Sequence, residues 1–165
     1  MQPITQSSAH AIRALTHLAL QDPGEFQLGK DMARELGVPA PFLVKLLQPL
    51  VARGLLESQR GRGGGFRLAL DPAEITLFRI VDAQEHLSRA RQCFLGQTEC
   101  SDERACPMHE FWKQAAGDLL ARLSATTLAD IARFCDRRPG SGYPNRAGPP
   151  GGRARRGKAS SSKRR

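Results

Sequence analysis

Three cysteines and a histidine lie within seventeen residues of this chain, in the segment "CFLGQTECSDERACPMH" that runs from Cys93 to His109. Six residues separate Cys93 from Cys100, five separate Cys100 from Cys106, and two separate Cys106 from His109. The residues between them include Gly, Pro and several polar side chains, which indicate an irregular loop rather than a core element. Thiolates and an imidazole on one loop can converge on one centre, so the segment is a candidate metal or redox site.

Spacing alone leaves four interpretations of this segment open. An iron–sulfur cluster suits wide gaps between its ligands, and histidine can replace cysteine on one iron. Structural zinc also accepts three cysteines and a histidine, but its sites usually contain two cysteines separated by two to four residues, and this segment has no such pair. A disulfide switch needs only two of the cysteines and leaves His109 without a role. The fourth interpretation is that these residues share no task.

The remaining cysteine, Cys135, lies beside Phe134 in a segment with helical apolar spacing, and we interpret it as a small buried hydrophobe. The sequence has no apolar run of the ~18 residues that span a bilayer, and its N-terminus lacks the pattern of a signal peptide. We therefore expect a cytoplasmic protein with reduced thiols. No Ser/His/Asp order, paired carboxylates or nucleotide-binding loop indicates an enzyme, so we expect none.

The charge of the chain is unevenly distributed. The net charge of the 165 residues is +9, yet residues 137–165 hold 10 of the 25 Lys and Arg residues and none of the 16 acidic residues. This Arg-, Gly-, Pro- and Ser-rich stretch predicts a disordered basic tail, which either improves solubility or holds phosphates weakly. The remainder, residues 1–136, is nearly neutral and predicts one folded domain.

The elements that must position the cysteine segment begin with a predicted helix in "SSAHAIRALTHLAL", which Ser7 or Ser8 could cap. A short helix in "GKDMAREL" follows and ends at Gly37. A longer helix in "PFLVKLLQPLVAR" then has Pro41 in its first turn, whereas Pro49 inside it predicts a kink or an earlier end. Two helices joined by a tight turn are typical of a helix-turn-helix.

A β-hairpin is predicted directly after these helices. The stretches "LLESQR" and "FRLAL" have strand-like patterns, and "GRGGG" joins them as a tight loop. The glycine run lacks the GKS or GKT of a phosphate-binding loop, so we interpret it as a hairpin tip from which Arg60, Arg62 and Arg67 can approach a DNA groove. An ordinary turn with solvated arginines is the alternative. Together these elements predict a mainly α fold with a small β-hairpin wing, that is, a winged helix-turn-helix.

Two further helices flank the cysteine segment. The first, in "ITLFRIVDAQEHL", could be capped by Thr76. The second is a long helix over residues 110–134 with a break at 124–127 and a narrow apolar stripe formed by Trp112, Ala115, Leu119 and Leu123. Such a stripe on a long helix in a small protein predicts a homodimer through this C-terminal helix, unless the stripe packs on its own domain.

From residue 1 to about 136 the sequence resembles the Rrf-type winged-helix regulators, which include the iron–sulfur cluster assembly regulator and the nitric-oxide-sensing repressor. The resemblance rests on "AIRAL", on "RGRGGGFRL", on the three-cysteine loop and on "TTLADI". It implies a homodimeric transcription factor, more specifically a repressor, with a cluster in the loop at about 91–110 that senses iron or cluster status, redox state or nitric oxide. By position, Cys93, Cys100 and Cys106 match the thiolate ligands, and His109 matches the histidine that completes a [2Fe–2S] site.

The resemblance also implies a double-stranded DNA operator as partner. The recognition helix would meet the major groove through Pro41, Phe42 and Lys45. The wing would reach the DNA backbone and minor groove through Arg60, Arg62 and Gly64. Ala9 stands where one branch of the family has an acidic cluster ligand. Val44 stands where another branch has an acidic residue that helps choose between DNA sites. We therefore carry neither property over to this chain. Two alternatives are a zinc- or disulfide-based switch of the same fold, and a small redox or metal-handling protein that binds DNA only through its tail.

Overall fold

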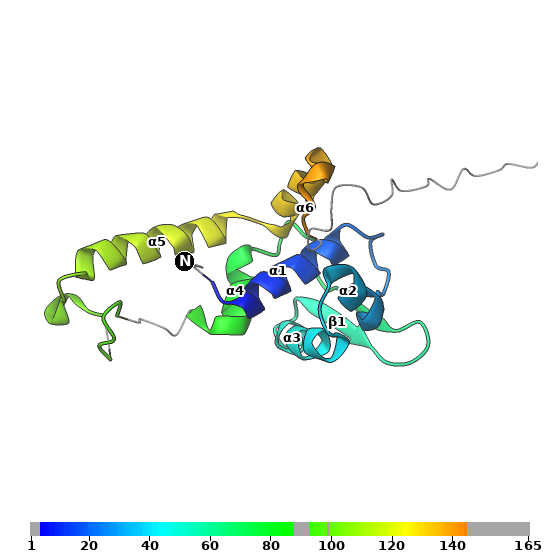
Figure 1. Ribbon diagram of the computed structural model, residues 1–165, viewed down its shortest axis with the longest axis horizontal. Helices are drawn as coiled ribbons and strands as arrows, with labels where there is room; N and C mark the ends of the chain where they lie inside the picture. Colours follow the sequence, from blue (N-terminus) through cyan, green and yellow to red (C-terminus); the bar gives the residue numbers. More distant parts are fainter. Residues whose placement is uncertain (1–3, 88–92, 99, 145–165) are drawn as a thin grey trace, which may run out of the picture.

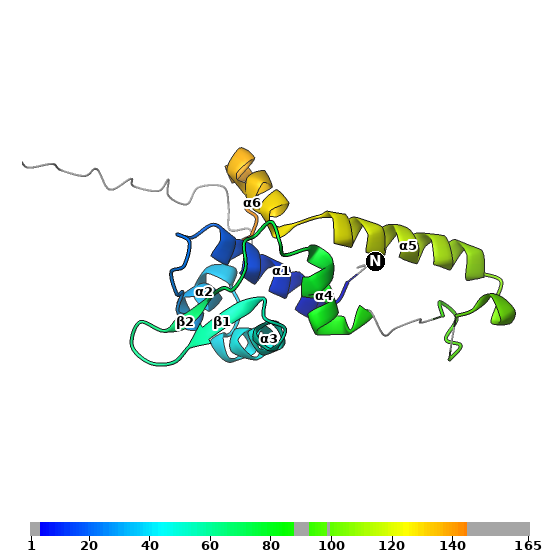
Figure 2. The same ribbon diagram turned by 180° about the vertical axis from the view of Figure 1, so that it is seen from behind.

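The computed structural model describes residues 4–87, 93–98 and 100–144. The predicted loop at 91–110 and the predicted tail therefore lie partly outside the described residues. Along the chain the elements are α1 (Gln6–Ala19), α2 (Gly29–Leu36), α3 (Ala40–Ala52), β1 (Leu56–Gln59), β2 (Gly65–Leu68), α4 (Leu77–Glu85), η2 (Asp102–Arg104), α5 (His109–Ala125), α6 (Leu128–Arg137) and η3 (Pro139–Ser141). The β-hairpin and the far end of α5 lie at opposite ends of an elongated molecule (Figures 1 and 2).

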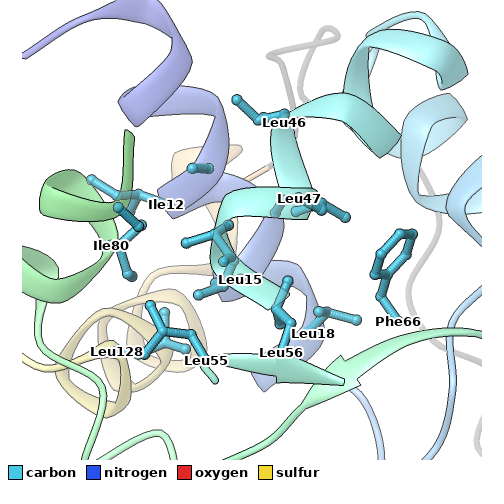
Figure 3. Close-up of a cluster of buried hydrophobic side chains, with 14 of the residues drawn as sticks. Ile12, Leu15, Leu18, Leu46, Leu47, Leu55, Leu56, Phe66, Ile80 and Leu128 are labelled. Carbon is cyan, nitrogen blue, oxygen red and sulfur yellow. The ribbon is translucent and has the colours of Figure 1, made fainter. Parts of the chain in front are cut away.

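The hydrophobic core lies between α1, α3, α4 and the β-hairpin. Apolar residues at helical spacing on α1 face Leu46 and Leu47 of α3 and Ile80 of α4 (Figure 3). Burying each such side chain contributes about 1.5–3 kcal/mol, so these contacts hold the helices around one centre. The fully buried members of this core include Leu15, Met32, Leu36, Leu43, Leu47, Leu50, Leu55, Leu56, Ile75, Ile80, Val81 and Leu128.

The predicted helix-turn-helix is confirmed. The chain bends by 110° between α2 and α3, an angle typical of this motif. Gly37 makes the turn possible because it adopts φ 66°, a left-handed conformation that costs glycine little. Pro49 lies inside α3, so the predicted earlier end is wrong: the helix continues to Ala52, although Pro49 lacks the N–H that would reach the carbonyl of Lys45, and the kink stays a prediction.

The predicted cap of the first helix is wrong by two or three residues. The side chain of Thr5, rather than Ser7 or Ser8, accepts a hydrogen bond from the Ser8 backbone N–H, at 3.2 Å. Glu85 at the end of α4 accounts for the difference, because its carboxylate accepts hydrogen bonds from the backbone N–H and the hydroxyl of Thr5, both at 2.8 Å. A contact across 80 residues of sequence thus places the start of α1.

The predicted wing is a two-stranded antiparallel hairpin in which Leu56 pairs with Leu68. Gln27 extends it by a β-bridge to Phe66, with two backbone hydrogen bonds of 2.9 Å. Gly64 is buried at the tip, where a β-carbon would lie 2.2 Å from the carbonyl oxygen of Gln59. Only glycine therefore leaves enough room at this position for the two strands to form the tight hairpin.

The segment predicted as a long helix over 110–134 with a break at 124–127 forms two helices, and the break is confirmed at Thr126 and Thr127, whereas residues 124 and 125 still belong to α5. Thr127 starts α6 with a capping box, in which its hydroxyl and the Asp130 carboxylate satisfy each other's backbone N–H groups. Hydrogen bonds from the backbone N–H and hydroxyl of Thr127, followed by one from Arg133, lower the pKa of Asp130 to about 2. The break is thus fixed by specific contacts.

The folded part extends beyond the predicted boundary at residue 136. Helix α6 runs to Arg137, η3 follows, and Pro144 is buried. The prediction of a tail from 137 onward is therefore wrong for 137–144, and residues 145–165 lie outside the described structure. Among the helices described here, no single one has the length and apolarity to span a bilayer, although the bent pair α2–α3 meets both criteria together.

Candidate cluster site and DNA-binding surface

The four predicted ligands come together as two pairs. The Sγ atoms of Cys93 and Cys106 lie 3.9 Å apart, and the Sγ of Cys100 lies 3.3 Å from Nδ1 of His109. All three cysteines are free thiols. His109 is the first residue of α5 and is only 4% exposed, and its backbone N–H donates to the carbonyl of Cys106 at 2.9 Å. The loop and the start of α5 therefore present three thiols and one imidazole to a shared region.

Asp102 holds the imidazole in place. Its Oδ1 lies 2.9 Å from Nε2 of His109 and 2.7 Å from Nζ of Lys113. Hydrogen bonds from Lys113 and His109 keep the pKa of Asp102 below its ordinary value, so the carboxylate is ionised at neutral pH and accepts a hydrogen bond from the Nε2–H group. We assign the Nε2–H tautomer on this basis, which leaves the Nδ1 lone pair directed at Cys100.

The thiols differ in their electrostatic surroundings. Backbone N–H groups of Gln97 and Leu95 lower the pKa of Cys93, because they stabilise its thiolate. Burial raises the pKa of Cys100, and negative charge on Cys93 and Cys106 raises it further. Three thiolates brought this close repel one another, so the arrangement favours a positively charged centre among them.

An aromatic contact ties the loop to α5. The rings of Phe94 and Trp112 lie 5.6 Å apart. At the other end of the predicted stripe, Leu123 is buried and Leu119 packs against the core of its own domain. This end of the stripe thus packs within one chain, and dimerisation through the rest of the helix stays a prediction.

Sequence reasoning missed Asp102 and Lys113. Neither belongs to a ligand spacing or an apolar period: the fold of the loop brings Asp102 to His109, and Lys113 lies about one helical turn after His109 on α5. Among the described residues, Asp102, His109 and Glu110 form the group of His, Cys, Asp and Glu whose ligand atoms all lie within 4.8 Å of one another. Asp102 is already engaged by the Lys113 ammonium, so we regard this group as support for the imidazole rather than as a separate site.

The predicted DNA-binding residues lie on two neighbouring elements. Pro41, Phe42 and Lys45 are exposed in the first two turns of α3, and Phe42 packs edge-on against His10 of α1, with 5.6 Å between ring centroids. Arg60 and Arg62 are exposed at the wing tip. Their exposure is compatible with contacts to a DNA groove and its phosphates, which stay a prediction.

Two residues of the wing have structural tasks. Gly64 is buried and closes the hairpin, so a DNA contact from it stays a prediction. Arg67 donates to Glu57 at 2.7 and 2.9 Å and to the carbonyl of Gly24 at 3.1 Å, and it lies over the ring of Phe26. The structure therefore differs from the prediction that Arg67 approaches DNA, because its guanidinium is held by the strand opposite it.

Comparison with known proteins identifies the family. The model of the Rrf2 family, described as iron-dependent transcriptional regulators, matches residues 4–133. The HTH-type transcriptional regulator NsrR of Bacillus subtilis is 30% identical over 131 residues, which cover 79% of this chain and 90% of NsrR.

Solved structures share the fold. CymR, the global cysteine regulator of B. subtilis, superposes with a TM-score of 0.68 at 24% identity, over 81% of this chain and 98% of CymR. IscR of T. potens superposes with a TM-score of 0.67 at 22% identity, over 82% of this chain and 90% of IscR. The chain belongs to the Rrf2 family and is a DNA-binding winged-helix transcriptional regulator.

Proposed function

We propose that this regulator, more specifically a repressor, changes its DNA affinity with the state of a [2Fe–2S] cluster on Cys93, Cys100, Cys106 and His109. The observation that carries the proposal is the arrangement of these ligands in two pairs. Two thiolates on one tetrahedral metal lie about 3.8 Å apart when each metal–sulfur bond is about 2.3 Å long. The Cys93–Cys106 distance of 3.9 Å fits one such metal, and the Cys100–His109 distance of 3.3 Å is close to what a second would need.

The pairing favours a centre with two metals over a single zinc ion. One tetrahedral ion would require all four ligand atoms to lie within about 4 Å of one another. No three of these four atoms lie within 4.8 Å of one another among the described residues. A [2Fe–2S] cluster instead takes two protein ligands on each iron, and histidine on one iron is an accepted variant.

The residues of this chain divide the remaining tasks. Asp102 fixes the tautomer and direction of His109, and backbone N–H groups near Cys93 stabilise its thiolate. Bound there, the cluster would supply redox chemistry and sensitivity to oxidants, iron supply or nitric oxide. On the DNA side, Lys45 and Phe42 would contact base edges, while Arg60 and Arg62 would contact phosphates. The protein would act in the cytoplasm on operator DNA and not as an enzyme.

Metal analysis tests the cluster. The full-length chain is purified without oxygen and its visible spectrum, iron, sulfide and zinc are measured. Near-stoichiometric iron and sulfide with a visible charge-transfer band are expected; Cys93→Ser should lose them, and the matched Cys135→Ser, a buried cysteine on α6, should retain them. Bound zinc without sulfide, or equal losses in both variants, would contradict the assignment.

Dimerisation through the 110–134 segment belongs to the same proposal. Helix α5 is long, and among its seventeen residues only His109 and Leu123 are buried, so most of its surface is at least partly exposed to a partner copy. Phe111 is 61% exposed, which makes it the strongest apolar anchor on this helix. Phe111→Glu should give a monomer by light scattering, while Leu28→Glu, at the start of α2, should leave a dimer. A dimer of Phe111→Glu would exclude α5 as the interface.

A disulfide switch is the second candidate, because the Cys93–Cys106 contact also favours it. These two thiols could form one disulfide by passing two electrons and two protons to an oxidant such as a peroxide. In that case the anaerobic protein would contain neither iron nor zinc. It would lose two titratable thiols on oxidation, and Cys106→Ser would abolish the accompanying change in DNA affinity.

A further inference from the structure

The recognition helix presents an apolar side chain in the middle of its exposed face. Its exposed residues recur at helical spacings of three and four, opposite the buried leucines, and include Pro41, Val44, Lys45 and Gln48. Val44 is 38% exposed and lies in the second turn of α3. The N-terminal part of such a helix is the part that contacts base edges. Val44 therefore belongs to the surface that would face DNA, although sequence reasoning did not assign it a DNA contact.

Packing fixes the direction of this side chain. A β-carbon on Gly29, the first residue of α2, would lie 3.4 Å from Cγ2 of Val44 and 3.4 Å from Cε2 of Phe66 on β2. One methyl group of Val44 is thus seated close to the start of α2 and to the wing. A β-branched side chain in a helix also has one strongly preferred χ1 rotamer, so it loses little freedom when a partner covers it. Val44 is therefore an apolar contact that is already oriented before a partner binds.

The charges around Val44 indicate the partner that suits it. Helix α3 contains no acidic residue, and its one charged residue is the neighbouring Lys45. The wing, whose strand β2 contains Phe66, adds exposed Arg60 and Arg62 at its tip. An apolar side chain among cations, with no acid on its own helix, suits a polyanion that also presents apolar groups. Duplex DNA meets both conditions, because the C5 methyl group of thymine is an apolar group on the base edges of the major groove.

We propose that Val44 is a specificity-determining residue that packs against the C5 methyl group of a thymine in the DNA site, so that this position of the site is a T·A pair. The inference rests on the proposed DNA contact by α3 and states what one further residue of that helix reads. A uracil at the same position would lack the methyl group and would leave Val44 without its partner.

Deoxyuridine in place of single thymines tests the contact, because it removes the methyl group and leaves base pairing unchanged. The starting duplex is selected from random DNA by the full-length natural chain, and each thymine of its two strands is then replaced in turn. Binding is measured by fluorescence anisotropy at one fixed salt concentration for the natural chain, Val44→Ala, Phe42→Ala and Lys45→Ala. One anaerobic preparation of each protein is used for all duplexes.

Uracil at the position read by Val44 should weaken binding of the natural chain about fourfold, which is the loss expected when one methyl group returns to water. Val44→Ala should bind the thymine and uracil duplexes with equal affinity, because each change removes one half of the same contact and the two are not additive. Lys45→Ala changes the adjacent exposed residue and should retain the fourfold difference. Val44→Ala should also keep the natural affinity for a random duplex, which shows that its phosphate contacts are intact.

Three results would overturn the assignment. In the first, no thymine of the selected duplex weakens binding of the natural chain when its methyl group is removed. In the second, Val44→Ala retains the fourfold difference while Phe42→Ala loses it, which makes Phe42 the reader of the methyl group. In the third, Lys45→Ala loses the difference to the same extent as Val44→Ala, so that the effect belongs to the whole helix rather than to one side chain.

The same preparations separate this inference from the function on which it rests. If the natural chain enriches no sequence from random DNA, base reading by α3 fails, and the role of Val44 fails with it. If a sequence is enriched but no thymine methyl group matters, only the role of Val44 fails. Iron and sulfide assays of each preparation test the cluster independently, because thymine and uracil duplexes are compared within one preparation.

Discussion

Removing the Asp102 carboxylate should make the proposed cluster much more labile. In the structure its oxygen lies 2.9 Å from Nε2 of His109, whose imidazole is buried. Asp102→Ala leaves this buried N–H without an acceptor, at a cost of about 1–3 kcal/mol, which corresponds to about 5- to 150-fold in an equilibrium constant. Loss of partners that orient metal-ligating histidines typically costs 10–100-fold in metal affinity, in agreement with that range. We therefore expect release of the cluster to a chelator to accelerate by one to two orders of magnitude.

Lys113→Met is the matched control for this change. It removes the other partner of Asp102 and leaves the contact with His109 intact. The side chains of Lys113 and Asp102 are 57% and 70% exposed, and such surface pairs change an equilibrium constant by at most about fivefold. The assay is the decay of visible absorbance under anaerobic chelator challenge. Equal rates for the two variants, or an Asp102→Ala cluster as stable as the natural one, would refute the role given to Asp102.

Three other outcomes are expected. Lys45→Ala should relax specificity at one base position, whereas Arg62→Ala should weaken binding to all duplexes and lower the salt slope by about 1; identical losses on every DNA would contradict the division of tasks. Gly64→Ala should destabilise the wing by about 1–3 kcal/mol in urea titrations, because its β-carbon would meet a backbone carbonyl at 2.2 Å. Burial lowers the pKa of His17, although the charge of Glu35 partly opposes this shift. The unfolded state therefore binds the imidazole proton more tightly than the folded state does, and the free energy of unfolding should fall as pH drops below about 6.5. His17→Gln should flatten that dependence, and a natural chain with equal urea midpoints at pH 7.5 and 5.5 would contradict it.

Local signals in the sequence were sufficient for the helix-turn-helix and the wing. Gly37 must adopt a left-handed conformation, Pro41 is tolerated in a first turn, and the glycines at 63–65 permit a tight hairpin. These requirements depend on neighbouring residues, except that Gly65 also leaves room for the carbonyl of Gln27. Where the decisive contact spans the chain, prediction failed: Thr5 caps α1 instead of Ser7 because Glu85 holds it.

The candidate site was predictable in its ligand types but not in its pairing. Spacing pointed to Cys93, Cys100, Cys106 and His109, yet no spacing rule assigns Cys93 to Cys106, because the path of an irregular loop is set by tertiary contacts. The orienting carboxylate of Asp102 was missed for the same reason. Arg67 was placed on the DNA side because its partner Glu57 becomes its neighbour only in the register of the hairpin.

The position of α5 determines how the two ends of the molecule can communicate. The cysteine segment lies at the far end of this helix, away from the wing (Figure 1). At its near end, backbone hydrogen bonds of 2.9 Å from Leu77 to Thr126 and 2.8 Å from Leu128 to Ile75 join the chain to the residues just before α4. The capping box at Thr127 lies at this joint, and Ile80 of α4 belongs to the same core as Leu46 and Leu47 of α3. If the proposed cluster or a partner copy changed the direction of α5, these contacts would therefore transmit the change through α4 to the recognition helix.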